Sequence, residues 1–193
     1  MKIISLTFIA AMFVALCGVR AGAQEQSATV VKPDRTEGAA EVYYLKDKNK
    51  SRAQVIIYLS GGPHDTGGKR DTLRMDVIFE SEGLKVVRPK YVFIAISSFS
   101  AAGPRYQKDR DLTIYTRDIK GFSSATFRTR MLSSSRQPSG EAAEVFVSSA
   151  IPYSKFLEFL AALDITVIIG ETQFKLTRDD VRALNDLNRT IEK

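Results

Sequence analysis

The sequence predicts an α+β fold, mainly β, in which an antiparallel sheet or sandwich of about eight strands is closed by a C-terminal helix–β-hairpin–helix module. Three observations support this class. Short apolar or alternating segments, separated by turn residues, recur along the chain at the spacing of an all-β fold. Apolar residues at helical spacing occur near the C-terminus. No strand–helix–strand rhythm, internal repeat or heptad pattern is present, so the helices are expected to cover one open face or edge of the sheet.

Seven strands are expected before the C-terminal module. The clearest is 72–80, in which polar residues alternate with an apolar set, as in a half-exposed antiparallel strand: Leu73, Met75, Val77 and Phe79. The other six are expected at 42–45, 55–59, 92–96, 112–116, 125–131 and 145–147. Between them, 46–52 is highly charged and is expected as a hairpin loop, and 99–110, which contains Gly103-Pro104, is expected as a long mobile loop.

The C-terminal module is expected to begin with a helix and continue as a hairpin. Pro152 fits the first helical turn, where its missing N–H costs nothing. A strand at 165–169 is followed by Gly170-Glu171, which provides a two-residue turn with Gly first, as a type II′ turn requires. The return strand contains Phe174 and Leu176. The apolar side of the helix is expected to consist of Phe156, Phe159, Leu160 and Leu163.

The last helix carries its own start signal. Thr177 is expected as its N-cap, with Asp180 at the capping-box position and Asp179 also in the positive first turn. A single apolar stripe follows, formed by Val181, Leu184, Leu187 and Ile191. The module contains no catalytic constellation, so its predicted role is in packing and not in catalysis.

The first 23 residues are expected to be a signal peptide. Lys2 precedes a run of apolar residues, 3–16, that is short for a membrane span, and Ala21-Gly22-Ala23 resembles a cleavage site. Cleavage after Ala23 would leave a flexible N-terminal segment, 24–40, and a single β-rich globular domain, 41–193. The expected location is periplasmic or secreted, with no transmembrane span in the mature chain; an uncleaved anchor is the alternative.

The cysteine count narrows the chemistry of an exported chain. The only cysteine, Cys17, lies in the signal segment, preceded by Leu16 where a lipoprotein would need a small residue. The mature chain would therefore have no disulfide, thiolate metal site or cysteine nucleophile.

The Gly-rich stretch 60–68 lacks the P-loop pattern, and the single histidine, His64, lies within it. No metal, cofactor or catalytic residue is predicted, and an enzyme is the less favoured class.

The positive charge is concentrated in one part of the chain. The whole chain has a formal net charge of +6, whereas the segment 105–136 contains eight basic and three acidic residues. If its strands bring these side chains to one face, they could bind a polyanion through charge and stacking. The alternative is an ordinary solvated face with its aromatic rings turned to the core. The candidate ligand-binding residues are Arg105, Tyr106, Lys108, Arg110, Arg117, Lys120, Arg128 and Arg130.

Three functional hypotheses follow. The first is an exported, non-enzymatic binding or interaction domain, whose ligand could be an anionic cell-envelope polymer or an acidic protein; nucleic acid is less favoured after export. The second is an envelope-polymer hydrolase that uses carboxylates distant in the sequence. The third is a structural subunit of an envelope complex, which would expose an apolar patch or an unpaired strand edge.

Overall fold

The computed structural model describes residues 38–60, 72–137 and 140–191. The expected signal segment, the lead-in up to residue 37 and the Gly-rich loop with His64 lie outside these residues. The described chain is mainly antiparallel β structure with two α-helices, which confirms the main feature of the predicted fold class. It contains more strands than expected, and they form two sheets of seven and four strands.

The seven-stranded sheet has the order β1-β2-β3-β4-β8-β7, with the short strand β9 paired to the start of β4. Every pairing is antiparallel. Its strands are β1 (Glu41–Leu45), β2 (Lys50–Ser60), β3 (Thr72–Glu82), β4 (Tyr91–Ser100), β7 (Thr129–Arg136), β8 (Ala142–Ser148) and β9 (Ile151–Pro152). The segment expected as a charged loop is shorter than predicted, because only a 3₁₀ turn (Lys46–Lys48) and Asn49 separate β1 from β2.

The four-stranded sheet has the order β11-β10-β5-β6 and is also antiparallel. Its strands are β5 (Leu112–Asp118), β6 (Gly121–Phe127), β10 (Asp164–Ile169) and β11 (Thr172–Lys175). The helices are α1 (Tyr153–Leu160) and α2 (Arg178–Arg189). The C-terminal hairpin β10–β11 is thus joined through β10 to a strand from the middle of the chain.

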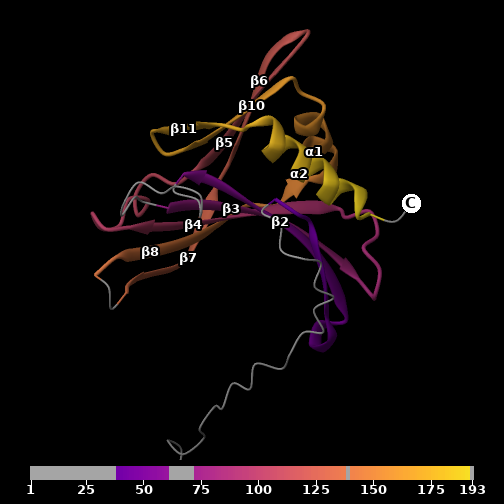
Figure 1. The fold of residues 1–193 in the computed structure, drawn as a ribbon, viewed down its shortest axis with the longest axis horizontal. Helices are drawn as coiled ribbons and strands as arrows, with labels where there is room; N and C mark the ends of the chain where they lie inside the picture. The colour runs from indigo at the N-terminus through magenta and orange to yellow at the C-terminus, as the bar shows by residue number, and fades with distance from the viewer. Residues whose placement is uncertain (1–37, 61–71, 138–139, 192–193) are drawn as a thin grey trace, which may run out of the picture.

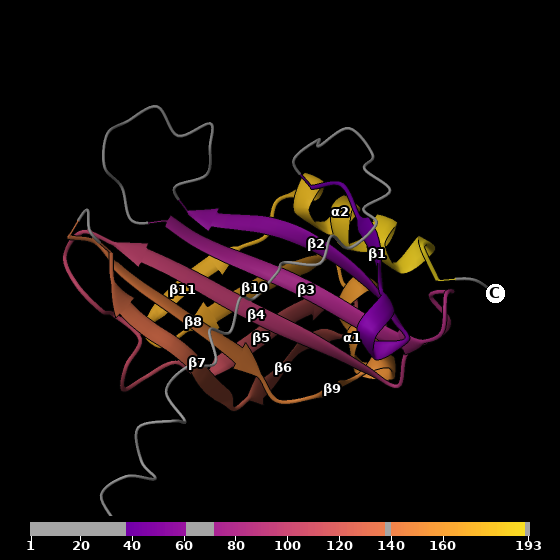
Figure 2. The ribbon, with the colours of Figure 1, turned by 90° about the horizontal axis from the view of Figure 1, so that it is seen from below.

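The inner face of the seven-stranded sheet packs against the helices and the four-stranded sheet (Figures 1 and 2). The buried apolar residues of both sheets and both helices form one cluster. Alternate residues point to the opposite, outer faces, as strand geometry requires. In β3, for example, Val77 and Phe79 are almost fully buried whereas Ile78 is half-buried.

The prediction of one strand over 125–131 is wrong, because the chain changes sheet at Arg128. Residues up to Phe127 belong to β6 of the four-stranded sheet, and Thr129 begins β7 at the edge of the seven-stranded sheet. The carbonyl of Arg128 accepts the N–H of Ser149 at 2.7 Å. Strands that cross between packed sheets commonly bend in this way, and residue alternation alone does not show where the bend falls.

The first helix differs from its prediction at both ends. Pro152 is the N-cap residue, with φ −56° and ψ 135°, and it is paired with Tyr91 as part of β9. The helix ends at Leu160, so Leu163 lies beyond it and is 66% exposed. Phe156 and Phe159 are buried as expected. The apolar stripe therefore extends past the actual end of the helix.

The turn and cap predictions near the C-terminus are confirmed. Ile169 is paired with Thr172 across the two-residue turn, and Gly170 has φ +56°. At the start of α2, the side chain of Thr177 accepts the N–H of Asp180 at 3.2 Å, and the Asp180 carboxylate accepts the N–H of Thr177 at 2.8 Å. Both features depend on residues within a few positions of one another.

The β4–β5 loop is tied to the core, contrary to the expectation of a long mobile loop. The carboxylate of Glu144, only 1% exposed, accepts the backbone N–H groups of Arg105 and Tyr106 at 2.7 Å and 3.1 Å. The ring of Tyr106 is buried and lies 5.6 Å from that of Phe146. The same loop approaches the β10–β11 turn, where a Cβ on Gly170 would lie 2.9 Å from the carbonyl oxygen of Asp109.

Candidate functional site

The eight candidate residues are distributed over several parts of the structure. Arg105, Tyr106, Lys108 and Arg110 belong to the β4–β5 loop, Arg117 and Lys120 to the β5–β6 hairpin, and Arg128 and Arg130 to the crossing into β7. Tyr106 is buried. Among the grooves of the described chain, one contains both Arg128 and Arg130, a second contains Arg117, and a third contains Arg105 and Tyr106.

The groove that contains Arg128 and Arg130, the sheet groove, lies on the outer face of the seven-stranded sheet and has a volume of about 610 Å³. Figure 2 views the molecule from the side of this face. Its floor is apolar and comes from β3, β4 and β8, and its rim is charged. The lining residues are Arg52, Ile78, Glu80, Phe93, Ala95, Arg128, Thr129, Arg130, Leu132, Val147, Ser148, Ser149 and Ala150.

Strand register places Arg130 beside this floor, and a backbone hydrogen bond holds Arg128 next to it. Arg130 is paired with Val147 in the β7–β8 ladder, and the bond between the Arg128 carbonyl and Ser149 holds the preceding turn. A register shift between Met131 and Ser133 leaves Leu132 without a ladder partner. Leu132 is 52% exposed and lines the groove. Such a bulge commonly changes the direction of a side chain.

The sheet groove carries a net positive charge, because three guanidinium groups and one carboxylate line it. Glu80 is occupied by Arg52, with a shortest distance of 2.5 Å between Nη2 and Oε1, and by Lys50 at 3.8 Å. Within the part of the chain that the structure describes, Arg128 and Arg130 have no carboxylate partner. These two exposed guanidinium groups can therefore bind an anionic ligand.

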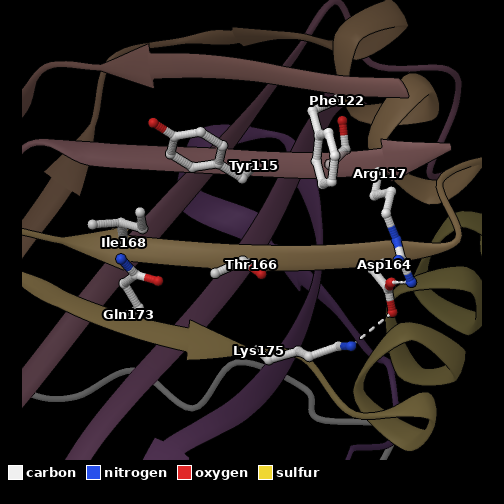
Figure 3. A pocket seen from close by; sticks show the side chains of 9 residues that line it. Tyr115, Arg117, Phe122, Asp164, Thr166, Ile168, Gln173 and Lys175 are labelled. Carbon is white, nitrogen blue, oxygen red and sulfur yellow. Dashed lines mark hydrogen bonds and ion pairs between the residues drawn. The ribbon is translucent and has the colours of Figure 1, made fainter. Parts of the chain in front are cut away.

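The groove that contains Arg117, called here the triad groove, lies on the outer face of the four-stranded sheet and has a volume of about 410 Å³. Figure 3 shows its side chains. Asp164 on β10 pairs with Arg117 on β5 and, at 3.0 Å, with Lys175 on β11. The pKa of Asp164 is lowered, mainly by the hydrogen bond from Lys175; desolvation opposes this shift, and the hydrogen bond and charge of Arg117 add to it.

Because the pKa of Asp164 is lowered in the folded state, its charge stabilises the fold above its unfolded pKa. That stabilisation is lost as the pH falls through the lower, folded pKa. We therefore expect Asp164→Asn to be less stable than the parent at pH 7, with the difference shrinking in acid. Urea unfolding between pH 7 and pH 2 measures this difference. Asp186→Asn is the matched control, because the partly exposed carboxylate of Asp186 pairs with one cation, Arg189 of the same helix, and joins no two strands. A pH-independent difference for Asp164→Asn would contradict the linkage.

Two further aspartates in this part of the chain, Asp118 and Asp111, accept hydrogen bonds from the backbone. Asp118 accepts the N–H groups of Lys120 and Gly121 at 2.7 Å and 3.0 Å, which fixes the β5–β6 turn, and Asp111 accepts the N–H of Thr129 at 3.3 Å. Among the described residues, no cluster of three or more metal-ligating side chains is present. None of the described helices is long and apolar enough to cross a membrane.

Sequence reasoning missed the two carboxylates that organise these regions. Glu144 lies among apolar residues of β8, and a charged residue in an apolar strand is the only sequence signal for its buried role. The sequence does not indicate the role of Asp164, because Arg117 and Lys175 become its neighbours only through the pairing of β10 with β5 and β11.

Comparison of the chain with protein-family models, with curated proteins and with solved structures finds no match in any of the three.

Proposed function

We propose that this protein is an exported, non-enzymatic binding domain whose sheet groove holds an anionic amphiphile of the cell envelope. The observation that supports this most strongly is the pair of exposed arginines, Arg128 and Arg130, beside an apolar floor. Guanidinium groups bind phosphate and carboxylate groups well because they donate several hydrogen bonds in a planar arrangement. The apolar floor suits a hydrocarbon segment attached to the anionic group.

The ligand class follows from the combination of an apolar floor and two cationic side chains in the groove. A purely polar polyanion would leave Ile78, Phe93 and Leu132 without contact, and a neutral lipid would leave the two arginines without a partner. An amphiphile with one or two acidic groups uses both parts. The expected export of the chain supports an envelope molecule as the ligand, with the signal segment proposed from the pattern at 1–23.

The scaffold beneath the groove is proposed to be closed by the C-terminal module. Phe156 and Phe159 of α1 and Leu184 and Leu187 of α2 belong to the buried cluster on the inner face of the large sheet. A packed inner face would keep the strands below the groove in fixed positions. Binding at the outer face would then require little rearrangement.

The proposal is tested with dodecyl phosphate below its critical micelle concentration, measured by titration calorimetry. We expect binding that weakens as salt rises, because the contact includes exposed charges. Reversing both charges, Arg128→Glu with Arg130→Glu, should weaken binding at least tenfold, since a hydrogen bond to a charged group contributes about 1.5–3 kcal/mol.

The matched control is the double variant Lys108→Glu with Arg136→Glu, which changes the net charge equally at exposed positions outside the groove. It should retain most of the affinity. An equal loss of affinity in both double variants would show that the net charge of the protein alone causes the effect. Dodecyl maltoside, which has the same chain and a neutral head, should bind more weakly than dodecyl phosphate; equal affinity would contradict a role for the arginines.

One observation favours the structural-subunit hypothesis as a second candidate. Strand β6 is an edge of the four-stranded sheet, and its seven residues, Gly121–Phe127, include no charged side chain and no proline. Natural edge strands usually carry such residues to prevent pairing with another chain. Recovery of a stoichiometric partner that is lost when Ser124 is replaced by Lys would favour this candidate. The hydrolase hypothesis gains no such support, since the described residues that line each of the two outer-face grooves include one carboxylate.

A further inference from the structure

The triad groove presents two exposed aromatic rings on neighbouring strands. Tyr115 on β5 is 44% exposed and Phe122 on β6 is 82% exposed. The register pairs Phe122 with Arg117 and Tyr115 with Ser124, so the two rings are diagonal neighbours on the outer face. Figure 3 shows both rings along the same side of the groove. Exposed large aromatic side chains that share one concave surface are typical of binding sites.

The floor of the groove, on β10, combines Thr166 with the apolar Ile168, and the far side, on β11, is polar. Thr166 of β10 is paired with Tyr115 on one side and with Lys175 on the other, so its short side chain lies between them. Gln173 of β11 adds an amide group, which both donates and accepts hydrogen bonds. The groove is therefore lined by aromatic rings along one side and by hydrogen-bonding groups along the other.

The charges at the end of the groove are largely matched. Arg117 and Lys175 both contact Asp164, which leaves one net positive charge and a set of donors and acceptors in fixed positions. An anion would have to compete with Asp164 for both cations. A neutral ligand with many hydroxyl groups could hydrogen-bond to this end without separating the three charges. A purely apolar ligand would leave these polar groups without partners.

We propose that the triad groove binds a neutral saccharide chain, with sugar rings on Tyr115 and Phe122 and hydroxyl groups on Gln173 and the Arg117–Asp164–Lys175 triad. The C–H face of a sugar ring carries a small positive potential and the face of an aromatic ring a negative one, so the two attract each other. The volume of about 410 Å³ lies within the usual range of small-ligand sites. This inference does not rest on the proposed function, because the sheet groove is on the other sheet.

The test is affinity electrophoresis of the full chain through native gels that contain one of four soluble polysaccharides: a β-glucan, an α-glucan, a galactomannan or glycol chitin. We expect retardation by at least one of them. Tyr115→Ala with Phe122→Ala should raise the dissociation constant at least tenfold, and Gln173→Ala should raise it less. The matched control is Tyr91→Ala, a 39% exposed aromatic residue of β4 outside this groove.

Absence of retardation by all four polysaccharides would overturn the proposal. Retardation that survives the double aromatic substitution would also overturn it, because the sugar would then bind elsewhere. Sedimentation of the same variants distinguishes another use of the face: a dimer that dissociates when the two rings are removed, with no polysaccharide binding, would identify the surface as a contact between copies of the chain.

Discussion

Replacing Phe159 with alanine is expected to lower the free energy of unfolding by about 3–5 kcal/mol, the usual cost of truncating a buried phenylalanine. Phe159 is 4% exposed, and its ring lies 6.2 Å from that of Phe127 in an edge-to-face arrangement. It therefore connects α1 to the end of β6, and its loss leaves a cavity between the helix and the four-stranded sheet. Urea unfolding followed by far-ultraviolet circular dichroism measures the change.

Leu163→Ala is the matched control for this substitution. Leu163 was expected on the same apolar stripe, but it is 66% exposed beyond the helix. Its truncation should change the stability by no more than about 0.5 kcal/mol, as at most surface positions. If Phe159→Ala unfolded like the parent, the proposal that the C-terminal segment closes the core would be wrong. A large effect of Leu163→Ala would show that this end of the sheet is covered.

Replacing Glu144 with alanine is expected to lower the free energy of unfolding by about 2–6 kcal/mol, since two amide groups lose their acceptor at about 1–3 kcal/mol each. These are the N–H groups of Arg105 and Tyr106. The substitution also removes these hydrogen bonds between the β4–β5 loop and β8, while the contact of the Tyr106 ring with Phe146 remains. Urea unfolding gives the global effect, and hydrogen exchange of the two amides should accelerate specifically.

Glu144→Gln distinguishes the loss of the acceptor from the loss of charge. The side-chain amide of glutamine keeps one acceptor oxygen, so most of the stability should return, with a deficit of about 1 kcal/mol for the weaker neutral hydrogen bond. Unchanged exchange of the Arg105 and Tyr106 amides in the alanine variant would contradict the role assigned to Glu144. It would show that the loop is held by other contacts.

Features encoded by neighbouring residues could be predicted from the sequence. The capping box of Thr177 and Asp180 and the Gly170-Glu171 turn are examples, because their hydrogen bonds and dihedral angles depend on a few adjacent positions. The buried face of β3 was also predictable, because alternate residues of a strand point to opposite faces and the apolar set marks the buried one. These features established β3, the β10–β11 turn and the start of the final helix.

Features that depend on pairing between distant segments could not be predicted. In the sequence, Arg128 and Arg130 continue the residue alternation of the last residues of β6, yet β6 and β7 belong to different sheets. Likewise, the sequence around Arg117 contains no sign of its partner Asp164, which lies 47 residues later. The eight candidate residues were chosen for their local density of charge, and density along the chain does not determine which side chains share a groove.

The most direct test of the proposed function is to map the amide chemical shifts of the protein during titration with dodecyl phosphate. Binding in the sheet groove predicts changes at Arg128 and Arg130 and at the strands beneath them, including Phe93 and Val147, with the amides of β10 and β11 unaffected. Changes centred on Arg105, Lys108 or Lys120 would place the anion elsewhere, and no saturable change at all would contradict the binding function.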